Sequence, residues 1–184
     1  AMFLPDNYPR DFSSYELIPG CVWVNTKSVA LDVGRGCPFS CTFCSTKTFW
    51  KQKFRLRNIT DILNEVKYLV ENYGVKIFDF KHDLFTVNKK RILQFCDGLQ
   101  NTGLKIEWGC DSRIGVIDTE MIDRMVDSGM TNIFFGIESG SDEMQKIINK
   151  RLNLNEADRI VKYCLNKGLK VTTSFIYGFP EETD

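Results

Sequence analysis

Residues 61–81, DILNEVKYLVENYGVKIFDFK, contain the repeating unit that decides the fold. Apolar residues recur at helical spacing over 61–73, which predicts an amphipathic helix. Gly74 is expected to end this helix as a left-handed cap, and the β-rich run VKIFDFK at 75–81 predicts a buried strand. The unit is therefore a helix, a glycine and a strand, in that order.

The same unit occurs three more times along the chain. The further helices are predicted over 88–101, from Asp118 to Gly129, and over 155–167, followed by the strands LKIEWGC, MTNIFFG and LKVTTSFIYG. The residues expected to face the core are Ile62, Val66, Leu69, Val70, Leu93, Cys96, Leu99, Met121, Ile122, Met125, Ile160, Val161 and Cys164. With SVALDV at 28–33 the chain supplies five strands. Units that recur on the order of every thirty residues predict an α/β fold of parallel strands, either most of a barrel or an open sheet.

The segments that follow the five strands carry the unusual residues. They read GRGCPFSCTFC, KHDLFT, CDSR, GIESGS and YGFPEET in chain order. The connections at the opposite end of the strands are short glycine turns. Because ligands bind at the carboxyl ends of parallel strands in βα folds, we expect one site built by these five loops.

Composition narrows the class of protein. The 184 residues are 43% hydrophobic and 26% charged, and 24 basic groups balance 24 acidic ones, which is typical of one soluble globular domain. A neutral balance gives no general attraction to phosphate backbones, so we do not expect nucleic acid as a partner. No apolar run approaches the roughly 18 residues that span a bilayer, and the polar start lacks a signal peptide. We therefore expect a cytoplasmic location and no membrane partner.

Two residue counts limit the chemistry. His82 is the only histidine, which excludes His-rich zinc sites and leaves one candidate base for a Ser-His or Cys-His nucleophile. The seven cysteines are an odd number in a chain without a signal peptide. This argues against a disulfide framework and for core thiols beside a metal or redox cluster.

Cys37, Cys41 and Cys44 form a CxxxCxxC pattern directly after the first strand. A structural zinc needs four ligands, usually from paired CxxC knuckles, and no second knuckle is present. A cluster ferredoxin would supply a fourth cysteine at close spacing. A 4Fe-4S cluster with three protein ligands instead leaves one iron open, which is what catalysis needs.

The cysteine loop resembles that of the radical S-adenosylmethionine (SAM) superfamily, whose signature CxxxCxφC is met by Cys37, Cys41, Phe43 and Cys44. The resemblance runs from about Val29 to the end of the chain. It implies a partial (βα)6 barrel of parallel strands, here truncated after the fifth strand. It also implies that the three thiolates bind a 4Fe-4S cluster, that SAM chelates the open iron, and that Phe43 lies against the adenine.

Further SAM contacts follow from the same resemblance. Lys81-His82-Asp83 stands where the family often has Gly-Gly-Glu, and Asp83 is expected to accept hydrogen bonds from the SAM ammonium. His82 is either part of that loop or a hydrogen-bonded structural residue. The run 83–86, Asp-Leu-Phe-Thr, resembles the version found in subfamilies with a cobalamin-binding domain.

The fourth strand ends in Glu138 and Ser139, which the resemblance places on the SAM ribose and carboxylate. A helix is predicted over 142–149, and Ser139 or Ser141 could instead simply cap it.

The fifth strand carries Ser174, Ile176, Gly178 and Glu181, which fit the family's GxIxGxxE adenine motif except for Ser at the first glycine.

Arg113, after the third strand, is expected to pair with the SAM carboxylate. Its alternative is a salt bridge to Glu107 or Asp111. The basic and aromatic stretch 47–57, KTFWKQKFRLR, could bind RNA, but we favour a loop that covers the cluster.

The function implied is reductive cleavage of SAM to a 5′-deoxyadenosyl radical, with an external one-electron reductant as partner. No catalytic residue beyond the cluster ligands is predicted, and the substrate is an unidentified small molecule or peptide. The alternatives are a non-catalytic Fe-S electron carrier and a βα module that binds structural zinc.

We divide the chain into a lead segment, 1–28, and a core, 29–184, that is incomplete at its C-terminus. The Pro-containing lead resembles a linker from a cobalamin domain outside this chain, which makes cobalamin a possible further cofactor. The last strand is expected to have an unpaired edge, through which the chain self-associates.

Overall fold

A five-stranded parallel sheet forms the centre of the protein in a computed structural model that describes residues 28–182. The strands are β1 (Ser28–Asp32), β4 (Ile77–Lys81), β5 (Glu107–Ser112), β6 (Met130–Glu138) and β7 (Lys170–Phe175), in spatial order β1-β4-β5-β6-β7. Every neighbouring pair is parallel, which confirms the α/β fold and matches a partial barrel. The predicted lead segment lies outside the described residues except for Ser28, which begins β1.

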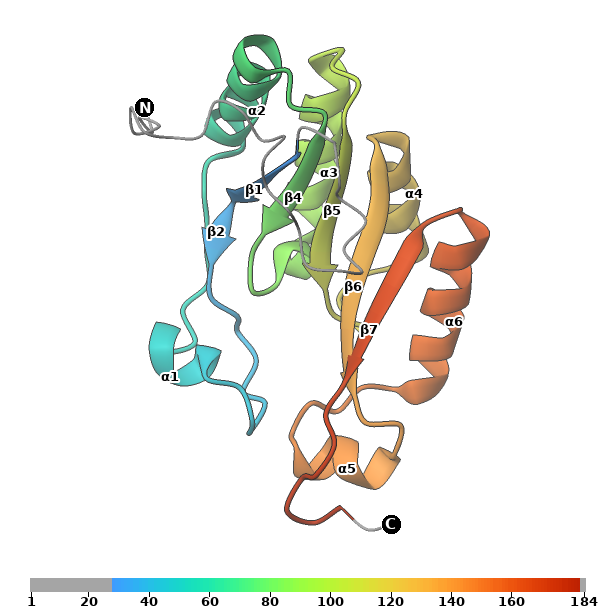
Figure 1. Ribbon diagram of the computed structural model, residues 1–184. Helices are drawn as coiled ribbons and strands as arrows, with labels where there is room; N and C mark the ends of the chain where they lie inside the picture. The colour runs from blue at the N-terminus through green and yellow to red at the C-terminus, as the bar shows by residue number, and fades with distance from the viewer. Residues whose placement is uncertain (1–27, 183–184) are drawn as a thin grey trace.

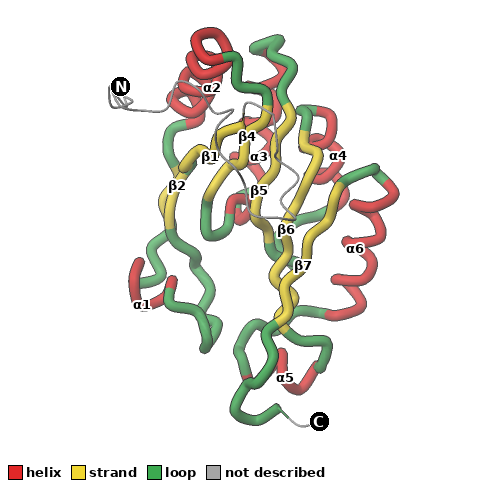
Figure 2. Tube along the Cα trace, viewed as in Figure 1, coloured by secondary structure: helices red, strands yellow, loops and turns green. Residues whose placement is uncertain are grey.

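Four crossover helices lie along one face of the sheet (Figures 1 and 2). They are α2 (Ile59–Tyr73), α3 (Lys89–Asn101), α4 (Thr119–Asp127) and α6 (Leu154–Asn166). Each begins at an Asn or Asp whose side chain accepts a hydrogen bond from a backbone N–H of the first turn. The glycines that follow them, Gly74, Gly103, Gly129 and Gly168, all have positive φ, as predicted.

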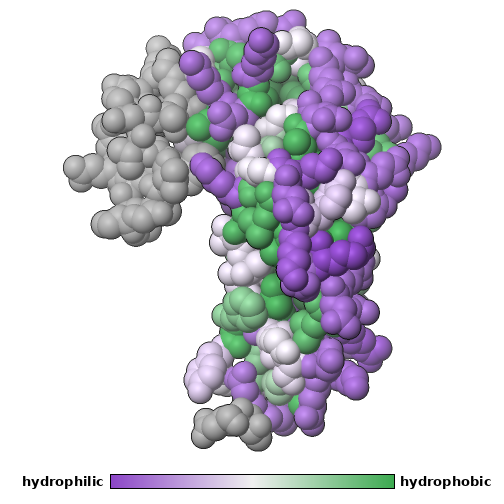
Figure 3. Space-filling model, turned by 90° about the vertical axis from the view of Figure 1, so that its right-hand side faces the viewer, coloured by the Kyte–Doolittle hydropathy of each residue, from purple (hydrophilic) through white to green (hydrophobic). Residues whose placement is uncertain are grey.

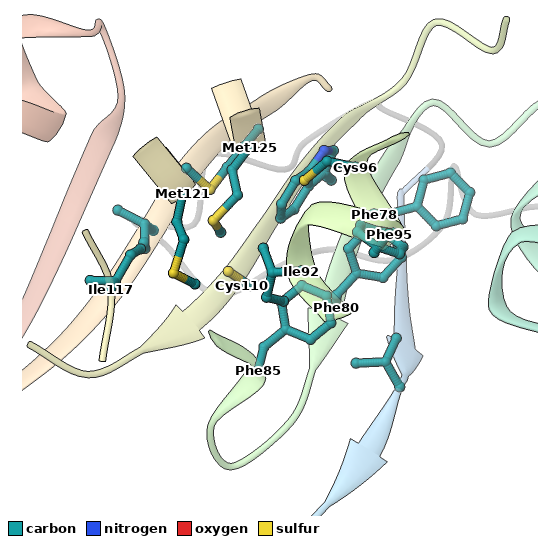
Figure 4. Close-up of a cluster of buried hydrophobic side chains, with 14 of the residues drawn as sticks. Phe78, Phe80, Phe85, Ile92, Phe95, Cys96, Cys110, Ile117, Met121 and Met125 are labelled. Carbon is teal, nitrogen blue, oxygen red and sulfur yellow. The ribbon is translucent and has the colours of Figure 1, made fainter. Parts of the chain in front are cut away.

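The core lies between the sheet and these helices (Figure 4). Phe80 on β4 packs 5.0 Å from Phe95 on α3 and 5.5 Å from Trp108 on β5, measured between ring centroids. Met121 and Met125 of α4 extend the same layer toward β6. Alternate strand residues are buried there, so the remaining side chains of each strand point to the opposite face of the sheet.

The predicted inward face of α3 is wrong in one detail. Ile92 and Phe95 are buried together with Cys96 and Leu99, whereas Leu93 is half-buried. The buried set has the i, i+3, i+4, i+7 spacing of one helix face, and the aromatic contacts of Phe95 fix that face against the sheet. In the other three helices every predicted residue is buried or packs against the core.

Several short elements were not predicted. β2 (Gly34–Arg35) pairs antiparallel with β3 (Arg55–Leu56), and α1 (Thr46–Trp50) lies between them with no buried residue. A 3₁₀ turn, η1 (Phe85–Val87), follows β4. By contrast, the helix predicted over 142–149 is present as α5 (Asp142–Ile147).

β7 forms one edge of the sheet, because its neighbour within the described residues is β6 alone. The face of the molecule that carries β7 exposes hydrophobic residues among hydrophilic ones (Figure 3). Phe175 at the end of β7 is 64% exposed, and Tyr177 in the following loop is 88% exposed. Within residues 28–182, none of the helices has the length and apolar character needed to cross a membrane.

Candidate functional site

The three clustered cysteines lie in the loop between β2 and α1, at the carboxyl edge of the sheet. Cys41 is buried, Cys37 and Cys44 are half-buried, and all three are free thiols. Burial raises the pKa of Cys37, and the nearby thiols of Cys41 and Cys44 add to the rise through charge repulsion. The three thiols are therefore close enough to interact electrostatically.

One side of the cysteine loop is held by Asp83, which follows β4. Its Oδ2 atom accepts a hydrogen bond from the backbone N–H of Gly36 at 2.6 Å, and its Oδ1 atom lies 3.4 Å from the Thr46 hydroxyl. Gly36 has φ +92°, and a Cβ there would lie 1.8 Å from the Lys53 carbonyl oxygen. Only glycine therefore fits where the loop approaches β3. The structure gives Asp83 a role in shaping the loop, and its predicted contact with SAM stays a prediction.

The other side of the cysteine loop rests on residues 148–150, directly after α5. The N–H of Thr42 donates to the Ile148 carbonyl at 2.9 Å. The Asn149 side chain donates to the backbone carbonyl and to the hydroxyl of Ser40, at 3.1 and 3.0 Å. Asn149 adopts a left-handed conformation with φ +52°, which asparagine tolerates better than most residues. The loop is thus fixed between two segments far apart in the sequence.

Arg113 also contacts this loop. Its Nη1 atom lies 3.6 Å from Cys41 Sγ, its Nη2 donates to the Lys150 carbonyl, and its guanidinium carbon lies 4.1 Å from the centroid of the Phe39 ring. Neither predicted salt bridge, to Glu107 or to Asp111, is formed. The reason is geometric, because the side chain extends past the end of β5 toward the cysteine loop.

Glu138 forms a buried ion pair beside the loop. Its Oε1 atom lies 2.7 Å from Lys150 Nζ, and both side chains are only 9% exposed. The Ser174 hydroxyl donates to its other oxygen at 3.2 Å, and its backbone carbonyl accepts the Ile176 N–H at 2.9 Å. Glu138 itself has φ +68°, which is uncommon for this residue type. The ends of β6 and β7 are therefore joined at this residue.

α5 is tied to the end of β6 by Gln145, which is 1% exposed. Its amide nitrogen donates to the carbonyls of Ile137 and Ser139, at 2.8 and 2.7 Å, and its oxygen accepts the Leu152 N–H. Ser141 caps the helix by accepting the Met144 N–H, so the capping alternative holds for Ser141. The Ser139 hydroxyl accepts the N–H of Ser141 instead.

The segment after β7 comes back to the cysteine loop. Phe43, 38% exposed, packs 5.8 Å from Phe179 between ring centroids, and Ile176 is similarly exposed. Gly178 has φ +88°, and its N–H donates to the carboxylate of Glu182 at 2.5 Å. Glu182 therefore shapes this turn. Glu181 is exposed beside it, and its predicted contact with SAM stays a prediction.

His82 makes hydrogen bonds within the protein, which agrees with the second of its two alternatives, a structural residue. Its Nδ1 accepts the Leu84 N–H at 2.8 Å, and its Nε2 lies 3.2 Å from the Arg55 carbonyl. These contacts assign the neutral tautomer with the proton on Nε2. Burial lowers the pKa of His82 below its usual value, which agrees with a neutral ring.

The face of the sheet opposite the helices is charged near the site. Lys81 pairs with Asp79 at 2.6 Å. Burial raises the pKa of Asp111 on the neighbouring strand, against the opposing charge of Lys81. Polar groups of β4 and β5 therefore lie on the sheet face opposite the helices, near the carboxyl ends of these two strands.

The donor set of this loop fits a 4Fe-4S cluster. A structural zinc site needs four ligands, whereas residues 36–45 supply three cysteines and no histidine or carboxylate. A cubane cluster binds each thiolate at a separate iron, so three cysteines of one loop can hold it and leave the fourth iron open.

Of the site residues predicted from the sequence, the three cysteines, Phe43, Arg113, Glu138, Ile176 and Gly178 lie at the same edge of the sheet. Four residues that shape this edge were not predicted: Gln145, Asn149, Lys150 and Glu182. The sequence did contain a signal for Lys150, because the short helix predicted over 142–149 returns the chain to the same edge of the sheet.

Comparison with known proteins agrees with this geometry. A family model described as the radical SAM superfamily matches residues 31–184. An uncharacterized methyltransferase of Pyrococcus horikoshii is 34% identical over 149 residues, which cover 81% of this chain and 32% of the relative. The anaerobic magnesium-protoporphyrin IX monomethyl ester cyclase of Rubrivivax gelatinosus is 26% identical, over 97% of this chain and 32% of that protein.

Solved structures share the fold. The radical SAM methyltransferase TsrM from Kitasatospora setae, with tryptophan and a SAM analogue bound, superposes with a TM-score of 0.76 at 15% identity. This match covers 85% of this chain and 32% of TsrM. The cobalamin-dependent SAM radical enzyme OxsB gives a TM-score of 0.70 at 20% identity, over 81% of this chain and 24% of OxsB. The chain thus spans about a third or less of these proteins, and it belongs to the radical SAM superfamily, which uses a 4Fe-4S cluster and SAM.

Proposed function

We propose that this chain is the core of a radical SAM enzyme that binds a 4Fe-4S cluster through Cys37, Cys41 and Cys44 and cleaves SAM reductively. One observation carries the proposal. The three free thiols occupy a single loop that is fixed from both sides, by Asp83 and by residues 148–150, at the ligand-binding edge of a parallel sheet.

When bound, the cluster and SAM would supply a one-electron cleavage that yields a 5′-deoxyadenosyl radical, which abstracts hydrogen from a substrate C–H bond. The protein's part is to hold and orient SAM. The half-exposed Phe43 and Ile176 offer apolar surface for the adenine, and Gly178 allows a close backbone approach. The further SAM contacts proposed are with the polar side chains of Asp83, Arg113, Glu138, Ser139 and Glu181.

Anaerobic reconstitution with iron and sulfide tests this function directly. The expected result is a 4Fe-4S complement whose EPR spectrum changes when SAM is added, followed by formation of 5′-deoxyadenosine under dithionite. A cluster whose spectrum ignores SAM would indicate an electron carrier. Zinc without sulfide would indicate a structural metal site. Either result would overturn the proposal.

A cobalamin-linked reaction is supported by the comparisons. OxsB and TsrM structures contain cobalamin, and relatives carry methyltransferase names. The names also include a cyclase, so SAM cleavage is the chemistry that we propose for the core itself. Co-expression with the remainder of a full-length homologue, followed by measurement of bound cobalamin, tests this link.

An external one-electron reductant completes the proposal. Residues 33–60 contain no acidic residue and six basic ones, namely Arg35, Lys47, Lys51, Lys53, Arg55 and Arg57. This segment includes the cysteine loop and the exposed helix α1, so it would attract an acidic carrier protein. Reversing the charges of Lys47 and Lys51 to Glu should slow cluster reduction by an acidic ferredoxin, and an unchanged rate would contradict it.

Self-association is proposed for the chain of 184 residues. The outer edge of β7 and its exposed Phe175 offer a template for another strand. Thr173→Lys should reduce association, because charged side chains block edge pairing. A wild-type chain that sediments as a monomer would exclude this proposal.

A further inference from the structure

The half-buried side chain of Arg113 lies at the end of β5 without an ion pair. Of the eight arginines in residues 28–182, Arg35, Arg57, Arg124 and Arg159 each pair with a carboxylate, whereas Arg55, Arg91, Arg113 and Arg151 do not. Among these four unpaired arginines, Arg113 is the one that contacts a thiol of the cysteine loop. Its charge is therefore not balanced by a carboxylate in residues 28–182.

The neighbours of Arg113 point instead to the cysteine loop. Nη1 lies 3.6 Å from Cys41 Sγ, a distance suited to an N–H···S hydrogen bond. Stacking on Phe39 at 4.1 Å and donation to the Lys150 carbonyl hold the guanidinium plane in place. The geometry is thus fixed by three contacts, and Cys41 is the residue among them that becomes anionic as a cluster ligand.

A fixed positive charge at this position acts on the reduction equilibrium of a cluster. Reduction adds one electron and hence one negative charge, and arginine stays protonated throughout. Hydrogen bonds to cluster sulfurs and nearby charge are recognised determinants of Fe-S reduction potentials. Partial burial of both groups strengthens the interaction, because water screens it less.

We propose that Arg113 is a redox-positioning residue, whose N–H···S contact with Cys41 raises the reduction potential of the cluster; this rests on the proposed function. The step is the transfer of one electron from a reductant, dithionite in the test, to the oxidised cluster. No bond forms or breaks, and no proton moves.

The test is a redox titration of reconstituted Arg113→Gln, monitored by EPR without SAM. The reduction equilibrium constant should fall at least tenfold, a shift of about 59 mV toward more negative potential. Arg113→Lys keeps the charge and should shift the constant less than Arg113→Gln does. Arg35→Gln is the matched control. Arg35 lies in the same segment as Cys41, residues 33–60, but it is 61% exposed and paired with Asp32. It should shift the constant less than twofold.

A second measurement does not depend on the stability of a variant. In wild-type protein labelled with ¹⁵N-arginine, pulsed EPR of the reduced cluster should show coupling to an arginine nitrogen, and Arg113→Lys should abolish it. Full iron content with an unchanged potential in Arg113→Gln, or no such coupling in wild type, would overturn the inference. Weakened SAM binding at unchanged potential would also overturn it and leave Arg113 a SAM ligand. Failure of wild type to hold a cluster would overturn the proposed function itself.

Discussion

The two ends of the five-stranded sheet are built on different principles. At the amino ends of the strands, the turns use Gly74, Gly103, Gly129 and Gly168 for left-handed backbone. At the carboxyl ends, Gly36, Gly115 and Gly178 also have positive φ, but so do five residues other than glycine, namely Lys51, Gln52, Glu138, Asn149 and Arg151. Such conformations cost of order 1–3 kcal/mol each and persist only where surrounding contacts enforce them.

Buried polar side chains follow the same division. Seven of the eight in the described chain lie at the carboxyl end, and Ser128 at the amino end is the exception. The amino end is thus optimised for folding, whereas the carboxyl end holds strain and buried charge. This difference indicates that the carboxyl end is shaped for binding.

The largest effect is expected from the cysteine loop. Cys41→Ala should reduce iron after reconstitution to the level of untreated protein, because three thiolates are needed to hold the cluster. Cys164→Ala is the control, since this thiol is fully buried on the core face of α6 and serves only packing. A full 4Fe-4S complement in Cys41→Ala, measured by iron and sulfide analysis, would contradict the assignment.

The buried ion pair tests how the carboxyl end is stabilised. Lys150→Met should lower the free energy of unfolding by about 3–5 kcal/mol, because it leaves Glu138 charged and buried with the Ser174 hydroxyl but without a positive partner. Lys162→Met, which breaks an exposed pair with Asp158, should cost no more than about 1 kcal/mol. Urea unfolding of the metal-free chain measures both, and equal losses would remove the distinction between buried and exposed pairs.

A smaller loss is expected when the space around that ion pair is filled. A Cβ on Gly136 would lie 2.3 Å from Glu138 Oε1 and 2.7 Å from Lys150 Nζ. Gly136→Ala should therefore destabilise by roughly 1–3 kcal/mol through overpacking. Gly140→Ala has nothing within 4 Å of its Cβ and should change stability by no more than about 0.5 kcal/mol. Urea unfolding measures both losses, and a loss for Gly136→Ala no larger than that for Gly140→Ala would contradict overpacking at Gly136.

The smallest effect concerns pH. Burial lowers the pKa of folded His82 below 6.5, so the unfolded chain binds a proton at a pH where the folded chain does not. This contribution to stability is complete above pH 6.5 and is lost as the pH falls toward the folded pKa. His82→Gln should weaken the fall of unfolding free energy below pH 6.5. If the unfolding free energy falls with the same slope below pH 6.5 in both proteins, groups other than His82 cause the fall.

Much of the fold could be predicted because its signals are local. The N-caps of α3 and α4, the glycine after each helix and the helical period of apolar residues all act within about one helix length. The inward face of α3 shows the limit of this reasoning, since Phe95 rather than Leu93 packs on the sheet. That choice depends on partners from β4 and β5.

The sequence by itself determined the helix–glycine–strand repeat, the parallel sheet and the cysteine motif, because each is encoded by neighbouring residues. Only the tertiary structure decided how the site is held. Asn149 meets Ser40 across 109 positions, and Arg113 meets Cys41 across 72. Such pairs depend on which strands become neighbours and where each loop returns, and no local pattern records that. The partners of Arg113 and Lys150 were therefore set by the order of strands in the sheet.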